Sequence, residues 1–248
     1  MKYIFSGRVL PERANVTVDP LQIKSNHGEA GLELDIKLSI GASQISAEAV
    51  INKGSTDIFT FKNIVEASVS AIVDAYGYIS GRGYDIEIAS VVDENANQTV
   101  FGVGVPALEA NKKERPLDFA GILRNFANSR FLVPALADLR EAIRSPHSGL
   151  FCFRAIECVR QHFYEKADGK ETDKSWQRLR ESLRIDIDYI KDVGKYALPQ
   201  RHSEGKFISD SERARILQNT WRIVDRFCIY LEKGSQPLDE NVFPILKL

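Results

Sequence analysis

The spacing of hydrophobic residues changes along this 248-residue chain, and that change limits the folds open to it. From Leu32 to Leu38 apolar and polar residues alternate with period two, which is typical of a half-buried strand. Further along, apolar residues recur at spacings of four and three: Val65, Val69, Ile72, Tyr76 and Ile79. That spacing indicates an amphipathic helix. After residue 116 every periodic segment has helical spacing, so the sequence predicts an α+β protein.

Residues 1–110 are expected to form an antiparallel sheet with one packed helix. The helix should end at Gly81 and Gly83, and polar turns at Asn52–Ser55 and Asp93–Asn97 should join strands. The expected strands are 2–10, 15–18, 32–38, 43–51, 57–61, 84–92 and 98–105.

Residues 117–233 are expected to form an all-α helical bundle. A charged linker, EANKKERP from Glu109 to Pro116, marks the boundary before it. The expected helices are 118–127, 130–144, 149–165, 172–183, 186–197 and 211–233. Residues 234–248 are expected to form a C-terminal tail on the surface.

The two parts differ in charge although the whole chain has a net charge of only −1. Residues 1–110 carry 8 Lys+Arg against 14 Asp+Glu, whereas residues 111–235 carry 24 against 18. Fifteen of those 24 cations are arginine, whose forked guanidinium suits phosphate and carboxylate. This asymmetry favours binding of a polyanion such as RNA by the basic part. Equally, the acidic sheet could recognise a protein partner or cover the basic part.

Location and cofactors are constrained by what the sequence does not contain. The start has no apolar run of a signal peptide, and no stretch reaches the length of a membrane span. The three cysteines are typical of reduced thiols, so a cytoplasmic protein is expected. No cofactor motif is found, and no metal is predicted, because Cys152 and Cys158 are six residues apart and cannot readily face one ion.

The segment from Leu198 to Lys206 is the strongest candidate for chemistry. Proline and glycine predict a loop here, and the loop holds Arg201 beside His202. An arginine can bind a phosphate, and a histidine can exchange a proton near neutral pH, as RNA cleavage through the 2′-hydroxyl requires. Glu157, on the polar face of helix 149–165, is expected to reach toward this pair. The alternatives are a histidine satisfied by local hydrogen bonds and an ion pair between Glu157 and Arg154.

The last helix has a polar face formed by residues three and four apart: Arg215, Asn219, Arg222 and Arg226. Three arginines in a stripe suit a phosphate backbone, so Arg215, Arg222 and Arg226 are expected to bind nucleic acid. The alternative is a solvated face, or one that packs on the acidic part.

The basic part resembles the HEPN superfamily of helical bundles, which includes toxins and defence-associated ribonucleases. The resemblance rests on FRAIECVRQHF (Phe153–Phe163), ALPQRHSEG (Ala197–Gly205) and the long closing helix. It covers at most residues 117–233. It implies a homodimer that cleaves RNA without metal, with an arginine and a histidine from each subunit.

The chain departs from the family's pattern at one place. His202 matches the family's histidine, but the positions of the arginine are filled by Lys195, Tyr196 and Ala197. Arg201, adjacent to His202, resembles divergent members connected with methylamine utilisation.

Two functions follow from these patterns. The first is an HEPN-like RNA-binding protein or metal-independent endoribonuclease in defence or stress response. The second is a non-catalytic dimeric interaction or sensor protein that recognises a protein through its acidic N-terminal domain.

Overall fold

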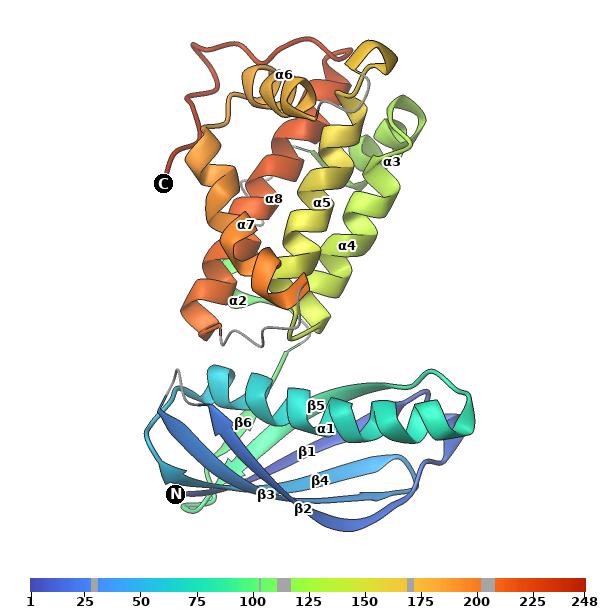
Figure 1. Cartoon of the computed structure of the whole chain (residues 1–248), viewed down its shortest axis with the longest axis vertical. Coiled ribbons are helices and arrows are strands. Elements are labelled where there is room, and N and C mark those ends of the chain that lie inside the picture. The colour runs from blue at the N-terminus through green and yellow to red at the C-terminus, as the bar shows by residue number, and fades with distance from the viewer. Residues whose placement is uncertain (28–30, 103, 111–116, 169–171, 202–207) are drawn as a thin grey trace. The chain divides into compact units, whose positions relative to one another are not determined.

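The computed structural model describes residues 1–27, 31–102, 104–110, 117–168, 172–201 and 208–248. The chain divides into two compact units, Met1–Val103 and Gly104–Leu248, which we call the sheet domain and the helical domain (Figure 1). The first unit holds an antiparallel sheet and one long helix, and the second holds helices. The predicted α+β class is therefore confirmed.

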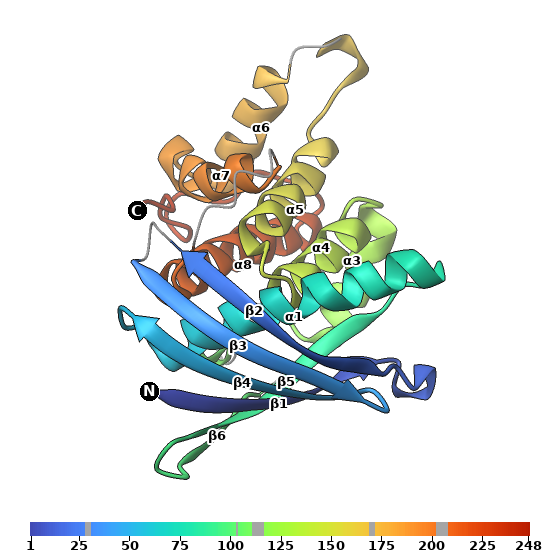
Figure 2. The same cartoon turned by 60° about the horizontal axis from the view of Figure 1, so that its bottom comes forward.

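The sheet domain contains six antiparallel strands in the order β2-β3-β4-β1-β5-β6. Their bounds are β1 Lys2–Leu10, β2 Val18–His27, β3 Leu32–Gly41, β4 Gln44–Lys53, β5 Asp85–Asp93 and β6 Gln98–Val100. A 3-10 turn, η1 (Glu12–Ala14), follows β1. Helix α1 (Ile58–Ser80) lies across one face of the sheet, as Figure 2 shows.

The two faces of the sheet differ in the way that the alternation of residues predicts. The inward side chains of β3, which are Leu32, Leu34, Ile36, Leu38 and Ile40, are all buried. The opposite face is polar and carries ion pairs between neighbouring strands. Lys2 of β1 pairs with Glu48 of β4, and Arg8 of β1 pairs with Glu87 of β5, each at 2.8 Å. One face therefore forms the core and the other meets water.

Residues 57–61 were expected to form a strand, but they begin helix α1. Asp57 is the N-cap, and its Oδ1 accepts hydrogen bonds from the backbone N–H groups of Phe59 (3.0 Å) and Thr60 (2.9 Å). Because one carboxylate satisfies two amides that the helix leaves unbonded, the cap outweighs the β-propensity of this short run. Strand β2 lies later in the chain than expected, at Val18–His27 instead of 15–18, and it includes Pro20, which an edge strand tolerates.

The helical domain contains all six helices that the sequence predicts, with ends shifted by a few residues. Their bounds are α3 Phe119–Asn128, α4 Leu132–Arg144, α5 Ser148–His162, α6 Asp173–Leu183, α7 Ile187–Arg201 and α8 Asp210–Glu232. A 3-10 turn, η4 (Lys166–Asp168), precedes α6. Helix α5 packs against α4, α7 and α8, and its side chains Cys152, Ile156 and Val159 are buried in the shared core.

The boundary between the domains lies before the predicted linker. A short helix, α2 (Pro106–Ala110), was not expected, and its Leu108 is buried in the helical core. The side-chain amide of Gln218 on α8 donates to the backbone oxygen of Ala107 at 3.0 Å. Residues 104–110 therefore pack with the helices, and the sheet domain ends at residue 103 instead of 110.

Two further expectations about the helical domain are wrong. Helix α7 continues past Ala197 to Arg201 and includes Pro199, whose missing N–H costs the helix one hydrogen bond. The residues after Gly234 were expected to be a surface tail, but Leu238 is buried and Leu246 pairs with Ile185. These residues form part of the helical domain.

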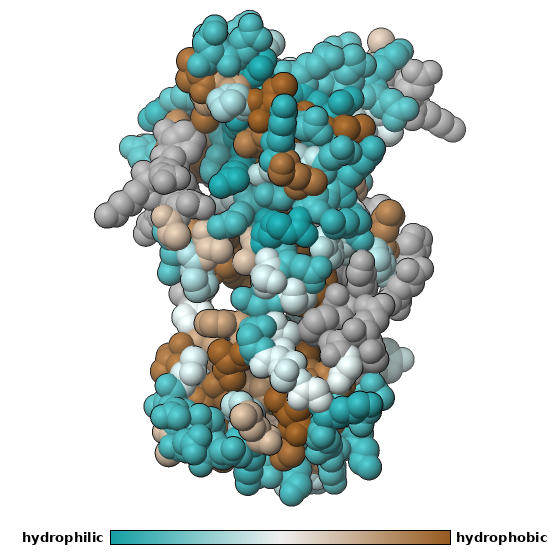
Figure 3. All heavy atoms as spheres, turned by 90° about the vertical axis from the view of Figure 1, so that its left-hand side faces the viewer, coloured by the Kyte–Doolittle hydropathy of each residue, from teal (hydrophilic) through white to brown (hydrophobic). Residues whose placement is uncertain are grey.

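The surface is mostly polar on the face that Figure 3 shows, where hydrophobic residues form small separate groups. No helix within the described ranges combines the length and apolar character needed to cross a membrane.

Candidate functional site

The end of α7 and the start of α8 are joined by a chain of polar contacts. Ser209 caps α8, and its backbone N–H donates to the Glu212 carboxylate at 3.0 Å. The Tyr196 hydroxyl of α7 donates to the other Glu212 oxygen at 2.8 Å. Burial would raise the pKa of Glu212, but the hydrogen bonds from Ser209 and Tyr196 outweigh it and the pKa is lowered. A carboxylate therefore links the end of α7 to the start of α8.

Asp192 is the centre of this contact, because its buried carboxylate binds two cations. Lys195, one turn later on α7, lies 2.5 Å from one oxygen, and Arg215 of α8 binds the other. The Asp192 side chain is 2% exposed, whereas those of Lys195 and Arg215 are 53% and 39% exposed. Arg215 also donates to the Tyr196 hydroxyl at 2.9 Å. We call Lys195 and Arg215 the cation pair.

The predicted arginine stripe is not a continuous surface. Arg226 is buried, and its guanidinium donates to the backbone oxygens of Leu183 (3.0 Å), Arg184 (2.6 Å) and Pro244 (2.6 Å). The expectation that Arg226 binds nucleic acid is wrong, because its donors are used inside the domain. Arg215 is held by Asp192, and Arg222 is exposed to solvent.

Glu157 does not lie beside Arg201 within one chain. Helices α5 and α7 are antiparallel: a Cβ on Gly149 would lie 2.7 Å from the Cβ of Tyr196, and one on Gly194 would lie 3.2 Å from the Phe153 ring. Glu157 is eight residues beyond this contact on α5, about 12 Å along the axis, and Arg201 is about 7 Å beyond it in the opposite direction. Glu157 and the backbone of Arg201 therefore lie on opposite sides of this contact. His202 and the side chain of Arg201 lie outside the described residues.

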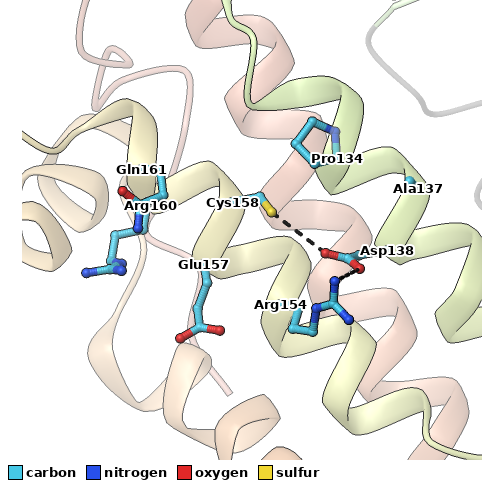
Figure 4. Close-up of a pocket in the computed structure, with 8 residues that line it drawn as sticks. All are labelled: Pro134, Ala137, Asp138, Arg154, Glu157, Cys158, Arg160 and Gln161. Atoms are coloured by element: carbon cyan, nitrogen blue, oxygen red, sulfur yellow. Dashed lines mark hydrogen bonds and ion pairs between the residues drawn. The ribbon is translucent and has the colours of Figure 1, made fainter.

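Glu157 instead lines a hollow of about 390 Å³ on α4 and α5, shown in Figure 4. The lining residues are Pro134, Ala137, Asp138, Arg154, Glu157, Cys158, Arg160 and Gln161. Arg154 reaches toward α4 and pairs with Asp138 at 3.1 Å, while Glu157 points away from that pair (Figure 4). The hollow therefore contains two arginines and two carboxylic acids.

The thiol in this hollow is not suited to nucleophilic chemistry. Cys158 donates to Asp138 at 3.7 Å, and burial together with the Asp138 carboxylate raises the pKa of Cys158 to about 11. Burial also raises the pKa of Asp138, despite the nearby Arg154. The thiol is protonated at neutral pH and serves as a hydrogen-bond donor.

The described histidines of the helical domain differ in their surroundings. His162 lies among the rings of Phe163, Phe227 and Tyr230, and one ring nitrogen is 3.1 Å from the Ser129 hydroxyl. Burial lowers the pKa of His162. His147, by contrast, is exposed at the N-cap of α5. No group of three or more His, Cys, Asp or Glu within the described ranges is placed to hold a metal ion.

Sequence reasoning did not single out Asp192 or Glu212, although signals for both exist. Ser209 followed three residues later by Glu212 is a capping-box pattern. Asp192 lies one turn before Lys195, a spacing at which opposite charges meet on a helix. The contribution of Arg215 from α8 had no such signal, because it depends on how two helices pack.

Two family models match the chain. Residues 3–101 match the model described as domain of unknown function (DUF8168) N-terminal domain, and residues 121–232 match the C-terminal domain of the same name. The two matched segments fall within the sheet domain and the helical domain respectively. No curated protein and no solved structure matches the chain.

Proposed function

We propose that this protein is an HEPN-like RNA-binding protein or metal-independent endoribonuclease that acts in defence or stress response. The observation that supports the proposal is the cation pair. Lys195 occupies a position where the HEPN pattern has arginine, and Arg215 stands beside it on the same buried carboxylate. A second helix thus contributes the guanidinium that the sequence pattern lacks.

The geometry of the cation pair suits a phosphate. Asp192 fixes both cations before a ligand arrives, so little side-chain entropy is lost on binding. Their half-exposed sides remain open to solvent, and the net charge of the three groups is positive. Arg222, exposed on the same helix, extends this surface toward a second phosphate. In this proposal His202 transfers a proton and Arg201 binds the phosphate that is cleaved.

RNA binding can be tested by fluorescence anisotropy with a labelled mixed-sequence RNA at several salt concentrations. We expect Arg222→Glu to weaken binding by about tenfold and to reduce the slope of log Kd against log salt by about one. Arg140→Glu is the control, because Arg140 is exposed on α4 and pairs with its neighbour Glu141. Equal affinities for both variants and wild type would contradict the proposal.

Cleavage is tested separately by incubating wild type and His202→Ala with mixed RNA in EDTA. We expect wild type to cleave the RNA and His202→Ala to cleave at least about 100-fold more slowly. Equal cleavage by both proteins, or none by either, would remove the enzymatic part of the proposal and leave RNA binding.

A non-catalytic dimeric interaction protein is the second candidate, and helix α3 supports it. Phe119, Leu123 and Phe126 recur at spacings of four and three, and they are 78%, 46% and 37% exposed. Such an apolar stripe is typical of a contact surface, and here we propose contact with a second copy of the chain. Sedimentation equilibrium should show a dimer for wild type and a monomer for Leu123→Glu. A monomeric wild type would remove the homodimer.

In this second candidate the acidic sheet domain binds a protein partner. Residues 1–103 carry 8 Lys+Arg against 13 Asp+Glu, and this net charge of −5 supports a basic partner surface. A pull-down with residues 1–110 that recovers no protein would count against it.

A further inference from the structure

Two of the described arginines in the helical domain are buried, and they differ in their partners. Arg226 donates to three backbone oxygens. Arg160, on α5, is 9% exposed, and its Nη1 donates to the Ser175 hydroxyl of α6 at 3.4 Å. Its guanidinium also lies 5.1 Å from the centre of the Trp176 ring. Its Nε is buried and has no hydrogen-bond partner among the described residues.

The Arg160 guanidinium also lacks a counter-ion. Within the described ranges, no Asp or Glu carboxylate forms an ion pair with it. Asp138, in the nearby hollow, pairs with Arg154 at 3.1 Å, and Asp173, the acid in the first turn of α6, is exposed. A buried charge is usually paired or fully hydrogen-bonded, because burial removes its hydration. One long hydrogen bond and one aromatic ring leave this cation short of partners, and an anion would supply one.

The first turn of α6 adds a second positive group at this place. Ser175, which contacts Arg160, is the third residue of α6, so the guanidinium lies beside the start of that helix. The N-cap residue Thr172 makes no side-chain hydrogen bond to the first amides. Unbonded amides and aligned peptide dipoles make the start of a helix positive, and phosphate groups bind there. A buried guanidinium and a helix N-terminus therefore meet where α5 packs on α6.

The hollow on α4 and α5 gives a ligand access to Arg160, which is one of its lining residues. Its volume of about 390 Å³ falls in the range of about 300–1,000 Å³ that is typical of small-ligand sites. The Arg160 side chain extends away from the pair of Arg154 and Asp138, as Figure 4 shows, and its contact with Ser175 brings it to α6. A guanidinium presents parallel N–H groups that match two oxygens of a phosphate.

We propose that Arg160 and the first turn of α6 bind an oxyanion of the phosphate class, from free phosphate or from the phosphate group of a nucleotide. The site is distinct from the cation pair. Arg160 is eleven residues from Gly149, about 16 Å along α5, whereas Lys195 adjoins Tyr196, which contacts Gly149. The inference therefore goes beyond the proposed function, and either proposal can fail without the other.

The test is thermal unfolding of the full-length protein in phosphate and in chloride at equal pH and ionic strength, followed by tryptophan fluorescence. We expect inorganic phosphate at ten times its Kd to raise the Tm of wild type by about 3–5 °C. Arg160→Gln removes the charge and should lose this shift. Arg140→Gln is the control and should keep it, because Arg140 is exposed on α4 and pairs with Glu141.

AMP carries the same group on a nucleoside, and adenosine lacks it, so we expect a shift with AMP and none with adenosine. The larger of the shifts with AMP and with inorganic phosphate at equal concentration identifies the source of the group. No shift for wild type, or equal shifts for wild type and Arg160→Gln, would overturn the inference, as would a shift that only Arg215→Gln abolishes. If Arg160→Gln does not fold, Arg160→Lys replaces it; it lacks the parallel N–H groups and should show at most about half of the wild-type shift.

Discussion

Arg222 and Arg226 are one turn apart on α8, but only Arg222 meets solvent. The guanidinium of Arg226 binds three backbone oxygens from two other segments of the helical domain. Burial lowers the pKa of Arg226, yet the group remains charged at any pH at which the protein folds. Arg226 therefore stabilises the fold of the helical domain, although the sequence pattern associates it with nucleic-acid binding.

The role of Arg226 can be measured as stability. Arg226→Gln should lower the free energy of unfolding of the helical domain by about 2–4 kcal/mol, because buried carbonyls lose charged donors. Both tryptophans of the chain, Trp176 and Trp221, lie in this domain, so urea denaturation followed by tryptophan fluorescence reports on it. Arg222→Gln should change the free energy by less than about 0.5 kcal/mol. Equal losses in the two variants would contradict this assignment.

His162 should make the helical domain less stable in acid. Burial lowers its pKa in the folded state below the unfolded value of about 6.5, so protonation favours unfolding. The contribution of neutral His162 to the free energy of unfolding is complete above about pH 6.5 and is lost as the pH falls through the folded-state pKa. In His162→Phe the unfolding free energy should decline less between pH 7 and pH 5 than in wild type. The same urea titrations check this, and identical slopes would exclude His162 as the source.

At the scale of elements, the contact between α5 and α7 determines which residues meet. Gly149 allows the closest approach, because a Cβ there would lie 2.7 Å from the Cβ of Tyr196 and 2.9 Å from its carbonyl group. This contact sets the offset of two antiparallel helices. The same offset carries Glu157 away from the backbone of Arg201.

Gly149→Ala should therefore destabilise the helical domain, although alanine is favoured over glycine within a helix. We expect a loss of about 1–3 kcal/mol, because backbone atoms of α7 must move. Gly194→Ala at the same interface meets the rim of the Phe153 ring at 3.2 Å and should cost less. Tryptophan fluorescence in urea compares the two, and a smaller loss for Gly149→Ala would contradict the explanation.

At the scale of the whole molecule, the last residues of the chain complete the helical domain. Leu238 is buried in its core, and the backbone oxygen of Phe243 accepts from Arg184 Nε at 2.7 Å. Pro244 provides one of the three carbonyls around Arg226. The domain that the sequence places at 117–233 therefore needs residues on both sides, from 104 to 246.

Truncation after Gly234 should destabilise the helical domain by at least about 3 kcal/mol, through lost apolar burial and three lost backbone contacts. Removal of only Lys247 and Leu248, which are both exposed, should have an effect below about 0.5 kcal/mol. Urea denaturation of the two truncated proteins decides the matter. If the protein truncated after Gly234 were as stable as the full-length chain, residues 235–248 would be a surface tail and the prediction would be contradicted.

The sequence by itself determined the fold class, the order of sheet and helices, and the six main helices, because hydrophobic periodicity follows directly from the geometry of each element. It also located the charge asymmetry and the position of Lys195. It missed the helix start at Asp57, where a cap outweighs local propensity, and it placed 104–110 in the wrong domain.

Only the tertiary structure decided which polar residues act together. Periodicity says which residues share a face of one helix, but not which helix packs against that face or with what offset. In the folded protein Arg226 is buried, and Arg215 and Lys195 both pair with Asp192. Glu157 lies far from the backbone of Arg201 because of the offset between α5 and α7. The offset between α5 and α7 depends on Gly149, which has no side chain to keep the two helices apart.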